Sequence, residues 1–295
     1  MLPETGRFAP TPSGPPHFGT MLAAIASFLH ARANNAQWLV RIEDLDPPRE
    51  VAGAADQMLR CLEAFGLEWD GEVMYQSRRE AAYQEALNQL LHENKAFPCA
   101  CSKRDLATAK RGEEGVIYPG TCRNGLPAGK QANSYRARVE QTIINFADLV
   151  QGNISQNLAS DIGDFIIRRG DGYFAYQLAV VVDDAAQGIT QVVRGSDLLG
   201  STPRQIHLQQ LLGIPTPAYL HIPIVQDSLG RKLSKSEGAA AIDPANPLGC
   251  WGQALEILGQ QPPPEVDSLT ELRDWAVAHW KPANIPHVRE LPSPN

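Results

Sequence analysis

Two short strings, far apart in the sequence, carry residue types suited to binding phosphate. His17 and Gly19 stand in RFAPTPSGPPHFGT, directly before an apolar stretch with helical spacing. The first turn of a helix has unpaired backbone N–H groups and partial positive charge, so it can bind an anion. Lys232 and Lys235 stand between glycines in GRKLSKSEG, and such a cationic loop suits a polyphosphate. Taken singly, the first string is equally consistent with a proline-stiffened turn, and the second is more typical of a solvated charged loop.

Metal ligands are a second kind of chemistry that the sequence offers. Three thiols lie close together in the sequence, at Cys99, Cys101 and Cys122. Thiolates select zinc in a tetrahedral site, and Tyr118 or His92 could supply the fourth ligand. The spacing is not the usual C-x₂-C pair, so free structural cysteines remain the alternative. We expect the other two cysteines, Cys61 and Cys250, to be inert core residues.

A helix and a strand must position the first string. Apolar residues recur on one side of the predicted helix at Phe18, Met21, Leu22, Ile25, Phe28 and Leu29. The run QWLVRIEDLD, Gln37 to Asp46, reads as a buried strand whose carboxylate-bearing end meets a ligand.

The second half of the chain repeats this alternation. Two β-branched-rich runs, Ala175 to Asp184 and Gly188 to Leu198, favour strands. The segment STPRQIHLQQLLG favours a helix that is capped by Ser201 or Thr202, has Pro203 in its first turn and ends at Gly213. Alternating strands and helices predict an α/β fold with a doubly wound parallel sheet. This alternation breaks over residues 98–171, which we interpret as an insertion. The proline-rich string QQPPPEV, Gln260 to Val266, predicts a stiff linker.

Composition excludes several classes of protein. The 295 residues are 43% hydrophobic, with no apolar run long enough for a membrane span and no leader peptide, so we expect a cytoplasmic protein with no membrane partner. The formal net charge is −7 and the isoelectric point is about 5.5, so nucleic acid could bind only at a local basic face. Five cysteines without a secretion signal argue against a disulfide framework.

Several strings together resemble one family. RFAPTPSG, HFGT, RIEDLDPPR, LAVVVDD, VVRGSDLLGSTPRQ, HIPIV and KLSKS occur in the order typical of glutamyl-tRNA synthetases, which are class I aminoacyl-tRNA synthetases. They extend over most of residues 7–238. The resemblance implies a Rossmann-type catalytic domain that joins glutamate to ATP, releases pyrophosphate and passes glutamyl-adenylate to an RNA hydroxyl, with Mg²⁺ accompanying ATP.

Departures from the family pattern refine this interpretation. Only 59 residues follow KLSKS, where glutamyl-tRNA synthetases carry a long helical anticodon-binding region, so we expect no anticodon-binding domain. The short chain and its C-x-C…Y-x₃-C insertion resemble paralogues that attach glutamate to the queuosine base in the anticodon loop of tRNA(Asp). The zinc ligands of those paralogues match Cys99, Cys101, Tyr118 and Cys122, which implies one structural Zn²⁺ per chain. Thr20 stands where the wider class often has a second histidine, as in many glutamate-specific members.

The resemblance also assigns site residues. The glutamate site would comprise Arg7, Phe8, Ala9, Pro10, Thr11, Glu43, Tyr176 and Arg194. ATP would be bound by His17, Gly19, Thr20 and Lys235, and the catalytic residues would be His17, Gly19, Lys232 and Lys235. The two arginines would bind carboxylates, Glu43 the ammonium group, and Tyr176 would hydrogen-bond the substrate. Structural ion pairs at strand ends are the alternative, and Asp44 and Asp46 are weaker candidates that cap or turn the chain.

The expected domain organisation follows from the same motifs. Residues 1–97 and 172–225 form the two halves of the Rossmann domain, 98–171 the zinc-containing insertion, and 226–295 the KLSKS loop with a helical C-terminal region. Insertion residues that could contact phosphate, or be solvated surface charges, are Lys103, Arg104, Lys110, Arg111 and Arg123.

Three functions are consistent with these features of the sequence. The first is ligation of glutamate to queuosine-containing tRNA(Asp), the second a shortened glutamyl-tRNA synthetase acting on a tRNA 3′ end, and the third a catalytically silent RNA-binding paralogue. Intact HFGT, RIED and KLSKS argue against the third, and the short C-terminal region argues against the second. We expect a monomer.

Overall fold

The computed structural model describes residues 4–46, 49–112, 114–226 and 242–292. Its α-helices are α1 Phe18–Ala33, α2 Ala54–Ala64, α3 Glu80–His92, α4 Leu158–Asp161, α5 Tyr176–Ala186, α6 Thr202–Leu212, α7 Pro247–Ile257 and α8 Leu269–His279. The strands of the central sheet are β1 Thr5–Phe8, β2 Gln37–Ile42, β3 Met74–Tyr75, β8 Ile143–Asp148, β9 Gly152–Asn157, β11 Gln191–Gly195 and β12 Ala218–Ile222. The remaining strands are β4 Ala96–Cys99, β5 Arg111–Gly112, β6 Gly115–Val116, β7 Ser134–Ala137, β10 Ile166–Arg168, β13 Ile224–Gln226 and β14 Glu290–Pro292.

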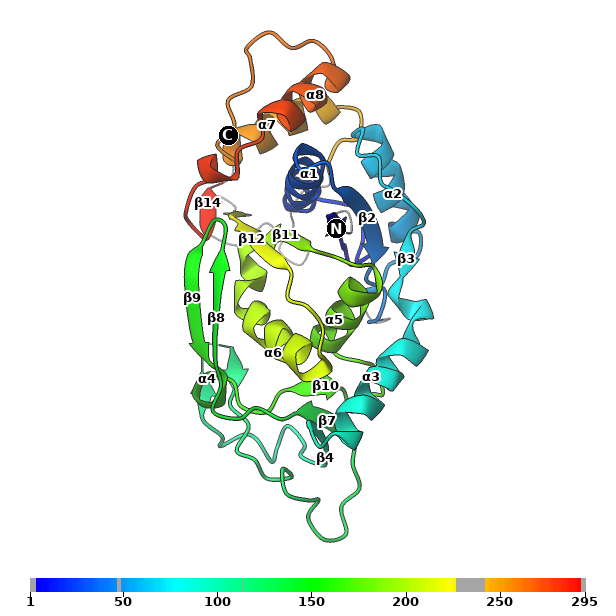
Figure 1. The fold of residues 1–295 in the computed structure, drawn as a ribbon. Helices are drawn as coiled ribbons and strands as arrows, with labels where there is room; N and C mark the ends of the chain where they lie inside the picture. Colours follow the sequence, from blue (N-terminus) through cyan, green and yellow to red (C-terminus); the bar gives the residue numbers. More distant parts are fainter. Residues whose placement is uncertain (1–3, 47–48, 113, 227–241, 293–295) are drawn as a thin grey trace.

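The central sheet is mostly parallel and has the strand order β3-β2-β1-β11-β12-β8-β9 (Figure 1). Its pairs are parallel from β3 to β8, and only the edge pair β8-β9 is antiparallel. The strand order reverses beside β1, where β2 lies on one side and β11 on the other. In open α/β sheets, ligands bind at the carboxyl ends of the strands beside such a reversal. The prediction of a parallel α/β sheet is confirmed.

Helices cover both faces of this sheet, as the alternation of buried residues along each strand shows. Trp38, Val40 and Ile42 of β2 pack in a cluster with α1, α2, α7 and α8, whereas Leu39 packs against a second cluster with α3, α5 and α6. Successive strand residues point to opposite faces, so both faces are apolar and buried. The sheet is therefore doubly wound, as predicted.

One predicted element has the wrong type. Residues 175–184 were expected to form a strand because of their β-branched run, but Tyr176–Ala186 is the helix α5. Leu178, Ala179, Val180 and Val181 are all buried there, since α5 packs against α3 and α6 as well as the sheet. A helix that is buried on most of its surface has no polar face, so its sequence cannot be told from a buried strand by periodicity.

Other local predictions are confirmed, with small changes at the boundaries. His17 is the N-cap of α1, and its Nδ1 accepts from the backbone N–H of Thr20 at 3.4 Å. The strand β2 ends at Ile42, so the carboxylates that follow lie beyond its carboxyl end. Gly213 ends α6 in the left-handed conformation, with a φ of 70°. Ser201 is the N-cap residue of α6 and Pro203 lies in its first turn, as predicted, but the side chain of Ser201 makes no cap hydrogen bond.

The predicted insertion forms one end of the molecule and also extends the central sheet. Strands β4, β7 and β10 make a separate antiparallel sheet, and β5 pairs with β6 in a small hairpin. Strands β8 and β9 belong to the central sheet, through the parallel pairing of Asp148 with Tyr219 of β12. The division into four segments itself stays a prediction.

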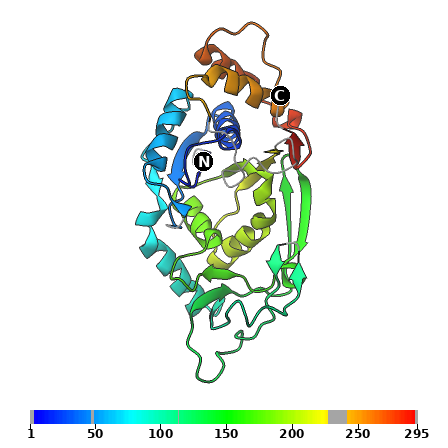
Figure 2. The same ribbon diagram turned by 180° about the vertical axis from the view of Figure 1, so that it is seen from behind.

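The C-terminal region lies at the opposite end of the molecule, as the two views in Figures 1 and 2 agree. Helices α7 and α8 pack against α1, and the predicted linker, Gln260 to Val266, joins them without helix or strand. The chain then returns along the body, where β14 pairs in parallel with β13. Among the described residues, no helix is long and apolar enough to cross a membrane.

Candidate active site

A pocket of about 780 Å³ opens at the carboxyl ends of β1, β2 and β11, beside the point where the strand order reverses. Seven of the eight residues predicted to bind glutamate line it: Arg7, Phe8, Ala9, Thr11, Glu43, Tyr176 and Arg194. Pro10 does not line the pocket, but its carbonyl accepts from the backbone N–H of Glu43 at 2.9 Å. This bond holds the chain after β1 against the chain after β2. The prediction therefore brought together residues that the fold does place in one site.

A buried ion-pair network holds Arg7. Its Nε donates to Asp184 Oδ1 at 3.2 Å, and Arg41 Nη2 donates to the same oxygen at 2.7 Å. Arg41 Nη2 also lies 3.7 Å from Glu43 Oε1. The carboxylate of Asp184, on α5, thus orients two arginines from two neighbouring strands.

The pKa values of Glu43 and Asp184 shift in opposite directions, although burial raises both. Burial raises the pKa of Glu43 to about 7, although Arg41 and Arg7 oppose the shift. Burial alone would also raise the pKa of Asp184, but its direct contacts with Arg7 and Arg41 bring that pKa below its usual value. Asp184 is therefore a fixed anion, whereas Glu43 ionises near neutrality and is stabilised in its charged form by any cation that enters the pocket.

Arg194 lies across the pocket in a different environment. Its Nη1 donates to the hydroxyl of Tyr176 at 3.3 Å, and its Nη2 donates to Thr202 Oγ1 and Gln205 Oε1, both at 2.8 Å. Its Nε donates to Nε2 of His221 at 3.0 Å. Of the two residues predicted as alternatives for the cap of α6, Thr202 instead binds the guanidinium group through its hydroxyl.

A smaller pocket of about 220 Å³ adjoins the first one at the N-terminus of α1. His17, Gly19 and Thr20 line it, together with Gly195 and residues of β12 and β13. His17, Ala23, Gly195 and Asp197 line both pockets, so the two pockets are adjacent. Lys232 and Lys235 lie outside the described residues, and their roles stay predictions.

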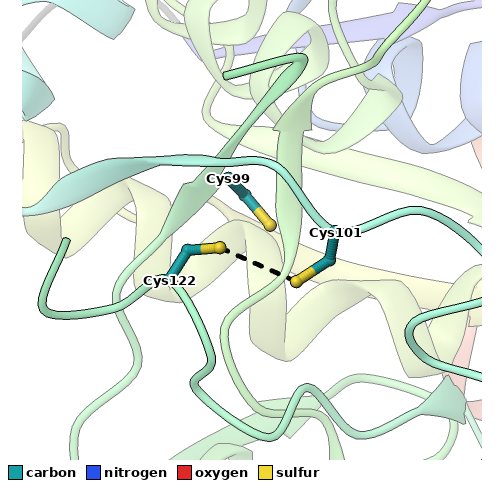
Figure 3. A group of neighbouring side chains, drawn as sticks. All are labelled: Cys99, Cys101 and Cys122. Atoms are coloured by element: carbon teal, nitrogen blue, oxygen red, sulfur yellow. Dashed lines mark hydrogen bonds between the residues drawn. The ribbon is translucent and has the colours of Figure 1, made fainter. Parts of the chain in front are cut away.

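The three predicted thiol ligands converge in the insertion (Figure 3). Their sulfur atoms lie within 4.8 Å of one another, and Cys101 Sγ is 3.7 Å from Cys122 Sγ. The hydroxyl of Tyr118 is 3.4 Å from Cys99 Sγ and 3.6 Å from Cys101 Sγ. The other proposed ligand, His92, is exposed at the end of α3 and is not part of this group.

Three of these separations, Cys101–Cys122 and the two from the Tyr118 hydroxyl, are close to the edges of a tetrahedron around zinc. With zinc–sulfur bonds of about 2.3 Å, two sulfur ligands lie about 3.8 Å apart, and a sulfur and an oxygen ligand about 3.5 Å. Burial alone would raise the pKa of the Cys99 thiol, but hydrogen bonds from Tyr118, the Cys101 backbone and Arg136 bring it down to about 7. A thiolate is therefore accessible at neutral pH, and the four donors are compatible with a structural metal ion.

Several residues of the site were missed by the reasoning from sequence. Arg41, Asp184, Gln205, His221 and Asp148 all orient a pocket residue, directly or through one neighbour. The available signal was an ionisable residue inside an apolar run: Arg41 in WLVRI and Asp183-Asp184 after AVVV. A charge in such a run is buried and needs a partner, although the sequence does not identify the partner.

Two groups of weaker candidates are also described by the structure. Asp44 accepts from the backbone N–H and hydroxyl of Ser77, so it has a structural contact, but with the turn before α3 and not with its own stretch of chain as the structural alternative expected. Arg123 forms an ion pair with Asp164 at 2.6 Å and donates to the carbonyl of Val139, so it is not simply a solvated surface charge, and its contact with phosphate stays a prediction. The other basic candidates, Lys103, Arg104, Lys110 and Arg111, are exposed.

The fold and site together define a class I aminoacyl-tRNA synthetase catalytic domain. Residues 5–246 match the family model for class I tRNA synthetases (E and Q), catalytic domain, and the chain belongs to this family. A glutamate tRNA ligase from Elizabethkingia meningosepticum, solved with its amino acid, has the same fold, with a TM-score of 0.81 and 22% identity over 99% of this chain and 67% of that one.

Relatives of higher sequence identity share one name within this family. The chain is 52% identical over 295 residues to a protein of Aromatoleum aromaticum named glutamyl-Q tRNA(Asp) synthetase, covering 99% of this chain and 93% of that protein. A protein of Thiobacillus denitrificans with the same name is 53% identical over 284 residues, which cover 95% of this chain and 94% of the relative.

Proposed function

We propose that this protein activates glutamate with ATP and transfers it to the queuosine base in the anticodon loop of tRNA(Asp). The main support for the proposal is that Arg7, Arg194 and Glu43 line one pocket, beside the N-terminus of α1. Two guanidinium groups and one carboxylate complement an amino acid with two carboxylates and one ammonium group. The names of the relatives at 52–53% identity support the same function.

The first step forms glutamyl-adenylate. An oxygen of the glutamate α-carboxylate attacks the α-phosphorus of ATP, the bond to the β-phosphate oxygen breaks, and pyrophosphate leaves. No covalent intermediate with the enzyme is needed, so the protein contributes mainly positioning and electrostatic stabilisation. Arg7 and Arg194 hold carboxylates, Glu43 holds the ammonium group, and the hydroxyl of Tyr176 contributes a hydrogen bond.

ATP lies over the first turn of α1 in this proposal. The smaller pocket adjoins the larger one there, with His17, Gly19 and Thr20 in its wall. Lys232 and Lys235 neutralise the triphosphate as charge moves onto the departing pyrophosphate, a role assigned from the KLSKS string alone. Mg²⁺ accompanies ATP and is held mainly by its phosphates.

The second step transfers glutamate to RNA. A hydroxyl of the vicinal diol on the queuosine ring attacks the carbonyl carbon of glutamyl-adenylate, and AMP leaves. The terminal ribose of a tRNA is also a vicinal diol, so the same catalytic face suits either acceptor. RNA specificity usually comes from unstacked loop bases, which an anticodon loop provides.

Cys99, Cys101, Tyr118 and Cys122 hold one zinc ion in this proposal. Its role is structural because four protein ligands leave no open position for water or substrate. The ion ties the chain after β4 to the loop after β6, which orders an end of the molecule with only a small apolar cluster of its own.

The decisive experiment compares acceptors for labelled glutamate. Queuosine-containing tRNA(Asp) and its isolated anticodon stem-loop should accept glutamate, whereas tRNA(Asp) without queuosine and tRNA(Glu) should not. Periodate cleaves vicinal diols, so it should destroy acceptance by a queuosine stem-loop that has no free diol at its 3′ end. Labelling of the 3′ end of tRNA(Glu), with the queuosine stem-loop left unlabelled, would instead establish a shortened glutamyl-tRNA synthetase.

A further inference from the structure

The guanidinium group of Arg194 is buried, yet its partners are all neutral. The residue is 5% exposed, and its side-chain nitrogens donate to a histidine ring, two hydroxyls and an amide oxygen. Within the described ranges, no carboxylate forms an ion pair of 4.0 Å or less with Arg194. Arg7 differs, because Asp184 accepts directly from it. Arg194 therefore brings a buried positive charge to the pocket without a carboxylate in direct contact.

The histidine in this set is His221, on β12, and its hydrogen bonds define its protonation. Nδ1 lies 2.6 Å from Asp148 Oδ2, and Nε2 faces the Nε–H of Arg194. Because an arginine nitrogen only donates, Nε2 must be the acceptor, so the proton sits on Nδ1 and is donated to Asp148. Both side chains are fully buried, which favours the neutral ring.

Asp148 is itself held rigidly at the end of β8. Its Oδ1 accepts from the backbone N–H groups of Val150 at 3.0 Å, Gln151 at 2.8 Å and His221 at 3.2 Å. The negative charge is thus satisfied by fixed donors and stays one imidazole ring away from Arg194. A carboxylate in direct contact would also orient Arg194 but would offset its positive charge, whereas Asp184 offsets the charge of Arg7 only in part because it is shared with Arg41.

We propose that His221, oriented by Asp148, is a positioning residue that fixes the Arg194 guanidinium while leaving its charge for a carboxylate of the substrate. The inference rests on the proposed function, since it takes glutamate as that substrate. It also gives the insertion a role in amino-acid binding, because Asp148 comes from residues 98–171.

The test is glutamate-dependent exchange of pyrophosphate into ATP by the full chain. His221→Leu should raise the KM for glutamate about 10- to 100-fold, the range for loss of a hydrogen bond to a charged group, and change the KM for ATP less than about twofold. His221→Gln should recover most of the affinity, because an amide can accept from Arg194 and donate to Asp148. The matched control is His207→Leu, which removes another buried histidine, bound to the Arg138 carbonyl, and should leave the KM for glutamate unchanged.

A second variant tests neutrality and does not require His221→Leu to fold. In Asp148→Asn/His221→Glu, a carboxylate replaces the ring beside Arg194, and the KM for glutamate should rise at least about tenfold although the guanidinium keeps an acceptor. A KM like that of the unaltered protein in this variant or in His221→Leu would overturn the role of His221. Absence of glutamate-dependent exchange in the unaltered protein would overturn the proposed function instead.

Discussion

Replacing Glu43 with glutamine should stabilise the protein and abolish its activation of glutamate. Burial raises the pKa of Glu43 from 4.5 to about 7. One pKa unit corresponds to about 1.4 kcal/mol, so keeping this group ionised costs the folded state about 3 kcal/mol. A carboxyl group with a raised pKa imposes no penalty below its unfolded pKa and the full penalty above its folded pKa. The gain from Glu43→Gln should therefore be about 3 kcal/mol at pH 8 and about 1 kcal/mol at pH 5.

The measurement is the free energy of unfolding from urea denaturation at pH 5 and pH 8, with glutamate-dependent pyrophosphate exchange on the same samples. Glu85→Gln is the matched control, because Glu85 is exposed on α3 and its replacement should change neither stability nor exchange. The reasoning is refuted if Glu43→Gln gains no stability at pH 8, or gains as much at pH 5 as at pH 8.

The remaining predictions concern the substrate, the KLSKS loop and the metal. The unaltered protein should activate glutamate and reject glutamine in pyrophosphate exchange, because a neutral amide would leave a buried arginine without a substrate carboxylate. Equal exchange with both amino acids would contradict the assignment of Arg7 and Arg194 as carboxylate-binding residues. Lys235→Ala should slow single-turnover adenylate formation about 100-fold or more with little change in glutamate affinity. A normal rate in this variant would show that KLSKS is a solvated loop without a catalytic role. Metal analysis should find about one zinc per chain, lost in Cys101→Ser and retained in Cys61→Ala; full zinc in Cys101→Ser would reject the site.

Local sequence patterns were sufficient to predict several helix and strand ends, including those beside the candidate active site. The helix after His17, the carboxylates beyond the end of β2 and the stop at Gly213 each depend on residues close together in the chain. The exception is α5, because the run that contains Val180 and Val181 is buried on most sides. Burial of that kind is a property of the neighbours of a segment, and no periodicity within the segment reveals it.

The sequence by itself determined the class of protein, because its motifs occur in the order typical of the family. It also predicted eight of the fifteen residues that line the larger pocket, because the chemistry of a side chain follows from its residue type. Only the tertiary structure decided how those residues are held. Asp184 pairs with Arg7 across 177 positions of the chain, and Asp148 contacts His221 across 73. Which arginine meets a carboxylate and which meets a neutral ring depends on how strands β1, β2, β8, β11 and β12 lie against α5, and a linear pattern does not encode that proximity. The charge left for the substrate is therefore a property of the assembled sheet.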